Sequence, residues 1–224
     1  MRTGFVMKTS VSTRVTAILD VACVWSYLGY TRLARAVSRY RDTSGDVEVA
    51  FRPFQVEPDV PAAGEPLAGH LRRTFGASAQ RRKEHVAALG AQVGIALNFD
   101  RAVRTNTFDA HRLIAAATTQ GRAEPMVERL FRAHFTDGLN VGDPATLASL
   151  AAQVGVVPSD TNAAEVRADI ERVLRSGVTG VPVFQFENRS PLIGDHPEDA
   201  FVAALWNDGR VPLREAQAER RDTV

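Results

Sequence analysis

The 224-residue sequence contains a single cysteine, Cys23. Because an intramolecular disulfide needs two cysteines, a small secreted fold held together by disulfides is excluded. No apolar run approaches the roughly 20 residues that a membrane-spanning helix needs, and residues 1–12 contain no apolar stretch long enough for a signal peptide. We therefore expect a cytoplasmic protein without a membrane partner, in a compartment where thiols stay reduced.

The sequence also lacks an excess of charge of either sign, since 27 basic and 26 acidic side chains give a formal net charge of +1. Attraction to a polyanion depends on clustered positive charge, so no nucleic-acid partner is expected. The short basic cluster at residues 81–83 is followed by Glu84 and indicates a solvated helix face. An apolar fraction of 45% is that of an ordinary globular domain with a sizeable core.

Sequence patterns for metal and nucleotide sites are missing as well. There is no glycine-rich phosphate loop and no pair of catalytic carboxylates. The five histidines are too scattered in the sequence to suggest a metal site: His70, His85, His111, His134 and His196. We therefore expect no metal, no nucleotide and no tightly bound cofactor.

Hydrophobic periodicity near the beginning of the chain predicts a strand, a helix and a second strand. Residues 14–20 are a short β-branched run, and residues 25–40 place apolar side chains along one helical face. Residues 47–54 alternate between apolar and polar side chains, as a strand does. This order indicates a βαβ unit whose first turn carries Cys23.

The middle of the chain, residues 61–176, has almost no strand pattern. Helices are predicted over residues 66–75, 78–90, 107–120 and 125–135, from Asp143-Pro144 onward, and over residues 162–176. Strand patterns return at residues 178–186 and 191–193, and a last helix is predicted over 196–206. We expect one domain over residues 1–224, with its sheet from residues 14–58 and 177–210 and a helical insertion at 61–176.

Cys23 lies between the end of a predicted strand and the start of a predicted helix, where unpaired backbone N–H groups and the helix dipole stabilise an anion. This position favours a reactive thiolate with a pKa below about 8.5. No histidine stands beside Cys23, so the thiol pKa is predicted to be only moderately lowered. The alternative is a small buried core residue. The segment Gly180-Val181-Pro182 precedes an apolar strand and says little on its own.

Five segments, in order along nearly the whole chain, carry a family resemblance. They are DVACVWSYLG at residues 20–29, FRPF at 51–54 with Pro58-Asp59, TNTFDAHRL at 105–113, LFRAHF at 130–135 and GVTGVPVF at 177–184. Together they resemble the FrnE-like branch of the DsbA-family oxidoreductases. The resemblance implies an α/β fold of thioredoxin-like type, β-α-β … β-β-α, with a large all-helical insertion.

The same resemblance implies roles for individual residues. Cys23 would be the nucleophile, and Val181-Pro182 would form a cis-proline loop that faces its sulfur and docks an extended thiol-bearing substrate. The insertion would cover the site and bring Asn106 and Phe108 to the substrate. The alternatives are that Asn106 caps a helix and Phe108 packs in the core, while His111 is expected to be structural.

The sequence differs from the family pattern at the residues that would carry out the chemistry. Ser26 stands where the family has its second cysteine, and Val24 where it has proline. One-subunit dithiol–disulfide cycling is therefore excluded. A monothiol oxidoreductase remains, in which Cys23 attacks a disulfide and glutathione or another small thiol resolves the mixed disulfide. The Ser26 hydroxyl, one helical turn on, would stabilise the thiolate, and Trp25 would lie at the mouth of the cleft, in contact with substrate or as a half-buried packing residue.

Two other functions stay open. The kappa-class glutathione transferases and hydroxychromene-carboxylate isomerases resemble this arrangement and activate a bound glutathione thiol, so a transferase or isomerase is the first alternative. A non-catalytic binding protein that keeps the cleft is the second. The expected partner is a small-molecule thiol or a disulfide-bearing substrate, and a lone cysteine is also compatible with a homodimer.

Overall fold

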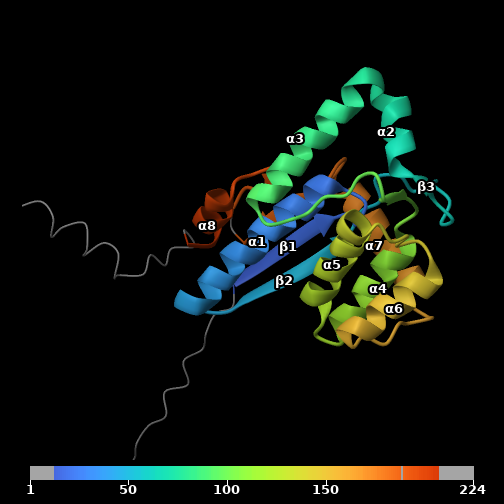
Figure 1. Ribbon diagram of the computed structural model, residues 1–224. Coiled ribbons are helices and arrows are strands. Elements are labelled where there is room, and N and C mark those ends of the chain that lie inside the picture. Colours follow the sequence, from blue (N-terminus) through green and yellow to red (C-terminus); the bar gives the residue numbers. More distant parts are fainter. Residues whose placement is uncertain (1–12, 188, 207–224) are drawn as a thin grey trace, which may run out of the picture.

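A mixed four-stranded sheet forms the centre of the molecule, and the computed structural model describes residues 13–187 and 189–206. The first strand, β1 (Thr13–Leu19), pairs in parallel with β2 (Val47–Pro53) and antiparallel with β5 (Val183–Phe186). The short strand β6 (Leu192–Ile193) pairs with β5, so the order is β2-β1-β5-β6. Figure 1 shows β1 and β2 side by side. The predicted thioredoxin-like α/β fold is confirmed.

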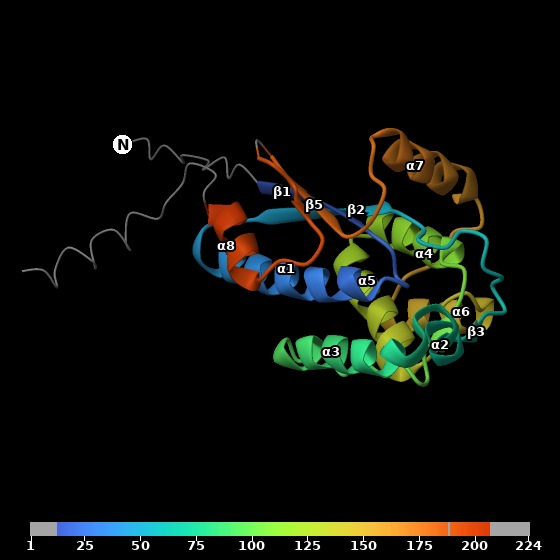
Figure 2. The same ribbon diagram turned by 90° about the horizontal axis from the view of Figure 1, so that it is seen from above.

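Helices cover both faces of this sheet (Figure 2). Successive residues of a strand point to opposite faces, and β1 has apolar side chains on both. Val15 and Leu19 of β1 belong to the large core beneath α1 (Val24–Thr43) and α8 (Glu198–Trp206). Ile18 instead packs with Val173 of α7 (Ala163–Arg175) on the opposite face. The sheet is therefore buried on both sides, with Cys23 at the end of β1 where α1 begins.

The insertion contributes most of the remaining helices. Its helical elements are α2 (Leu67–Phe75), η1 (Gly76–Ser78), α3 (Ala79–Gln92), α4 (Phe108–Thr119), α5 (Ala123–Arg132), η2 (Ala133–Asp137), α6 (Pro144–Val154) and α7. The predicted N-cap of α6 is confirmed, because the Asp143 carboxylate accepts the Thr146 N–H at 2.7 Å. The helix predicted over 125–135 continues through η2 as a π-helix. Of the helices in the described part of the chain, none combines the length and apolar character needed to cross a membrane.

The insertion is not entirely helical, in contrast to the prediction. The two-residue strands β3 (Glu65–Pro66) and β4 (Val103–Arg104) form a separate antiparallel pair. Arg104 holds this pair in place, since its guanidinium binds Glu57 at 2.7 Å and Glu65 at 2.8 Å. The sequence did not predict this pair for two reasons. A strand of two residues has no alternating pattern, and Glu57 and Glu65, which bind Arg104, are distant from it in sequence.

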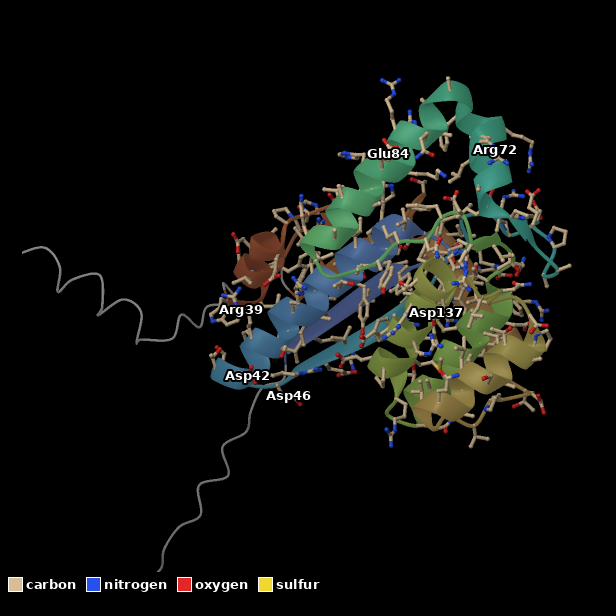
Figure 3. All side chains as sticks on the ribbon, in the orientation of Figure 1. Arg39, Asp42, Asp46, Arg72, Glu84 and Asp137 are labelled. Atoms are coloured by element: carbon tan, nitrogen blue, oxygen red, sulfur yellow. The ribbon has the colours of Figure 1, made fainter. Side chains whose placement is uncertain are left out.

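The helices α2 and α3 project from the body as an arm that carries Arg72 and Glu84 (Figure 3). On α3, the side chains of Arg81 and Arg82 are exposed, as the basic cluster predicted. Lys83 is less exposed and binds Asp100 at 2.6 Å.

The strand predicted over 178–186 is shorter than expected. It begins at Val183, and residues 178–182 form a loop beside Cys23 instead. Pro182 has no backbone N–H to donate to a strand ladder, which favours this break. The expected domain limits at residues 1, 210 and 224 lie outside the described residues.

Candidate active site

Cys23 occupies the N-cap position of α1 and faces the loop that precedes β5. Its backbone N–H donates to the Asp20 carbonyl at 3.0 Å, which closes the turn between β1 and α1. Its Sγ donates to the Val181 carbonyl at 3.6 Å, and the Val181–Pro182 peptide bond is cis. The structure therefore joins two segments of the predicted site that are 158 residues apart in sequence.

Close packing holds this loop against α1. The backbone of Gly29 approaches β5 so closely that a Cβ there would lie 2.9 Å from the Phe184 ring and 3.4 Å from Pro182 Cγ. Any side chain at position 29 must displace one of these groups. Gly29 therefore fixes the distance between the helix that carries the thiol and the loop that faces it.

Ser26 occupies the first turn of α1 and is completely buried. Its hydroxyl accepts the Asp20 N–H at 3.4 Å and acts to lower the pKa of the Cys23 thiol. The backbone N–H groups of Trp25 and Ser26 also stabilise the sulfur as an anion. This is the local arrangement expected at the beginning of a helix.

The prediction of a moderately lowered thiol pKa is nevertheless wrong. Burial raises the pKa of Cys23, and the nearby Asp20 charge raises it further. The hydrogen bonds from Ser26 and Trp25 lower the pKa but do not compensate. Removal from water disfavours the charged form of any thiol, and here this effect exceeds that of the helix terminus.

Asp20, only 1% exposed, lies directly beneath the active-site turn and was not singled out from the sequence. One carboxylate oxygen accepts the Ala22 N–H at 3.2 Å and the other the Val56 N–H at 2.7 Å. Burial opposes its ionisation, but hydrogen bonds from His111, Val56 and Thr107 lower its pKa. Asp20 is therefore ionised at neutral pH.

Two buried histidines lie near this acid. His111 Nε2 is 3.5 Å from Asp20 Oδ1 and 2.9 Å from the Phe54 carbonyl, so it has partners, as expected of a structural histidine. His134, in the π-helical segment, is 1% exposed and its Nδ1 has no hydrogen-bond partner in the described part of the chain. Burial lowers the pKa of His134 to about 4 and keeps it neutral at physiological pH.

The other predicted site residues lie in different surroundings. Trp25 is half-buried and packs against the main core. Asn106 precedes Thr107, the N-cap of α4, and its Oδ1 accepts the Phe108 N–H at 2.9 Å. Its Nδ2 donates to the Pro58 carbonyl at 2.6 Å. Phe108 is half-buried beneath the guanidinium of Arg167, 4.7 Å from the ring centre. A substrate-binding role for these three residues stays a prediction.

Two hollows on the surface are large enough to hold a small molecule or a peptide segment. A hollow of about 500 Å³ is lined by the loop of residues 176–183 together with Gln185, Pro191, Ile193 and Gly194. It includes Val181 and Pro182, so a chain bound there would lie next to the loop that Cys23 contacts. A second hollow of about 560 Å³ follows α1 from Tyr27 to Ser38 and does not include Cys23.

Comparisons with known proteins agree with this geometry. The model of the DSBA-like thioredoxin domain matches residues 14–206. A probable DsbA oxidoreductase from Streptomyces coelicolor is 30% identical, with a TM-score of 0.78 over 90% of this chain and 92% of its own. Among curated proteins there is no match.

Two more distant structures share the fold. The cytosolic disulfide reductase DsbM from Pseudomonas aeruginosa is 21% identical, with a TM-score of 0.55 over 92% of this chain and 99% of its own. A 2-hydroxychromene-2-carboxylate isomerase is 14% identical, with a TM-score of 0.63 over 92% and 98%. Because the family model spans the sheet, the insertion and the cysteine turn, this chain belongs to the family of DSBA-like thioredoxin domains.

Proposed function

We propose that this protein is a monothiol thiol–disulfide oxidoreductase. The observation that carries the proposal is the placement of one sulfur, Cys23 Sγ, at the N-terminus of α1 and 3.6 Å from the Val181 carbonyl. The buried Ser26 stands at the position of the family's second cysteine, and its hydroxyl acts to lower the pKa of this thiol. Family membership supports thiol–disulfide chemistry, and a single sulfur requires a second thiol from solution to complete the cycle.

The cycle has two exchange steps. The Cys23 thiolate attacks a substrate disulfide R–S–S–R′, so that a Cys23–S–S–R bond forms and R′–S⁻ leaves and takes up a proton. A small thiol such as glutathione, as its thiolate, then attacks the R sulfur and releases Cys23 as the leaving thiolate. In total the small thiol is oxidised to a mixed disulfide with R, and R′–S is reduced to R′–SH. Ser26 and the Trp25 N–H stabilise the Cys23 thiolate in both steps.

Glutathione fits this proposal as co-substrate. The DsbM structure was solved with GSH, so the shared fold is able to hold this tripeptide. The proposal also needs a compartment that supplies reduced thiol, as the cytoplasm does.

The raised thiol pKa gives the reaction a characteristic pH dependence. At pH 7 Cys23 is mostly protonated, and its thiolate fraction increases as the pH rises towards the raised pKa. We expect the alkylation rate of the native protein to reach its midpoint at a higher pH than that of the denatured protein. Iodoacetamide labelling across pH measures both midpoints. A native midpoint below the denatured one would contradict the burial effect.

Turnover tests the function itself. Wild-type protein with glutathione should reduce a mixed disulfide of glutathione and a cysteine peptide, and Cys23→Ser should abolish the reaction. Ser26→Ala should slow it about tenfold, the value of one hydrogen bond to a charged group. The exposed Ser38 on the same helix provides the control, because Ser38→Ala should leave the rate unchanged. Turnover that persists in Cys23→Ser would refute a cysteine mechanism.

A glutathione-dependent transferase or isomerase is the second candidate, and the raised pKa of Cys23 favours it. A thiol that keeps its proton donates a hydrogen bond rather than attacking, which suits a site that activates a bound glutathione sulfur. Calorimetry with Cys23→Ser separates the two functions, because saturable glutathione binding in this variant supports the second. Absence of both turnover and glutathione binding would refute both and leave a non-catalytic binding protein.

A further inference from the structure

Arg32 on α1 has a charged group that is almost completely withdrawn from water. Its side chain is 9% exposed, and one nitrogen of the guanidinium, Nη1, makes two contacts. This nitrogen binds the Asp195 carboxylate and donates to the His196 carbonyl at 3.0 Å. Both partners lie in the loop between β6 and α8. Burying a guanidinium costs desolvation energy, and a buried ion pair often adds little stability, so this pair is better explained by the geometry that it fixes.

The loop that Arg32 holds is part of the hollow beside the cis-proline loop. Gly194 lines this hollow of about 500 Å³ together with residues 176–183. The Gly194 N–H donates to the Pro182 carbonyl at 2.9 Å, which ties the two segments together. Asp195 follows Gly194 directly in the chain. By binding Asp195, Arg32 therefore also restrains the neighbouring N–H that holds the cis-proline loop.

Two further arginines on α1 provide a comparison. Arg35 and Arg39 lie 3.8 and 3.4 Å from Glu198 at the beginning of α8. Their side chains are 46% and 57% exposed, so water screens these ion pairs. Glu198 is not among the residues that line the hollow in the described part of the chain. Of these three arginines, Arg32 is the buried one, and its partners directly follow Gly194.

We propose that Arg32 is a positioning residue for substrate binding that acts through the loop between β6 and α8. By holding Asp195, it keeps Gly194 bonded to the Pro182 carbonyl and so keeps the hollow in the shape that receives an extended peptide. A small disulfide without a peptide backbone does not need this shape. The effect on the substrate rests on the proposed function, whereas the position of Gly194 is measured without any substrate.

Steady-state kinetics of Arg32→Met with two substrates test this role. Methionine keeps an apolar stem in the buried site and removes both contacts. The KM for the mixed disulfide of glutathione and a cysteine peptide should rise about tenfold, the value of one hydrogen bond to a charged group, while kcat stays unchanged. Reduction of 2-hydroxyethyl disulfide by glutathione should not change. Because both contacts come from one nitrogen, the ammonium group of Arg32→Lys should restore most of the wild-type KM.

Arg39→Met is the matched control on the same helix, and it should leave both reactions unchanged. If Arg32→Met does not fold, Asp195→Ala answers the same question, because it removes the other half of the ion pair at a side chain that is 38% exposed. Equal losses with both substrates would indicate a general structural role and overturn the proposal. An unchanged KM for the peptide would overturn it as well.

Hydrogen exchange of the Gly194 amide is the measurement without substrate. Its exchange should be about tenfold faster in Arg32→Met, relative to the amide of the buried Ala17 in β1, which reports global unfolding. Arg39→Met should not change this ratio. An unchanged ratio in Arg32→Met overturns the proposal. Absence of turnover in the wild type, with the exchange rates as expected, would refute the proposed function and not the role of Arg32 in holding Gly194.

Discussion

The Ser26→Cys variant is expected to form an intramolecular disulfide with Cys23 and to become a dithiol reductase. Position 26 lies in the first turn of α1, and its hydroxyl is near enough to the Cys23 sulfur to act on the pKa of that thiol. A sulfur at this position would attack the mixed disulfide from within the same chain. Intramolecular attack avoids the cost of bringing two molecules together, so insulin reduction with dithiothreitol should increase on the order of 100-fold.

Thiol counting provides the second measurement for this variant. After mild oxidation, Ser26→Cys should have no free thiol, and Cys23→Ser/Ser26→Cys should keep one. The single-thiol control should also lack the increase in insulin reduction. Two free thiols in oxidised Ser26→Cys would show that the turn does not bring the two positions together.

The second large effect is expected in the core rather than at the thiol. Phe131 of α5 is completely buried and stacks on Tyr27 of α1 with ring centres 5.0 Å apart. Its ring also lies 6.0 Å from that of Tyr30. Phe131→Ala removes these contacts and leaves a cavity between the insertion and the thioredoxin-like part. We expect it to lower the free energy of unfolding by about 3–5 kcal/mol.

Urea unfolding followed by circular dichroism measures this loss. Phe108→Ala is the matched control, since Phe108 is half-buried beneath Arg167 and should cost much less. A loss below about 1 kcal/mol for Phe131→Ala would mean that the core collapses around the missing ring.

The sequence predicts the fold well where a local pattern is long enough. The helix start at Asp143 is an example, because an N-cap residue and a proline at the first helical position act within one turn. The strands β3 and β4 were missed because each has two residues and their pairing depends on Arg104. The loop before β5 was predicted as strand because its β-branched residues resemble one locally.

At the candidate site, too, the local features were predicted and the effects of residues distant in sequence were missed. The residues around Cys23 indicate a helix terminus, and this local feature does stabilise an anion. The thiol pKa is nevertheless raised, because the burial of Cys23 and the charge of Asp20 outweigh it. The charge of Asp20 is in turn supported by Val56 and His111, which are distant in sequence. No pattern within one segment of a single sequence contains that information.

The contact between Cys23 and Val181 has a consequence for the order of events at this site. The proposed function has an extended substrate dock on this loop with the Val181 carbonyl as its hydrogen-bond acceptor, and the Cys23 S–H group already donates to that carbonyl. An S–H is a weak donor, so a backbone N–H of the incoming chain wins the competition for this oxygen. In the resting protein the Cys23 sulfur is therefore held by the Val181 carbonyl. Binding of the substrate backbone and release of the sulfur from this carbonyl then occur in the same step.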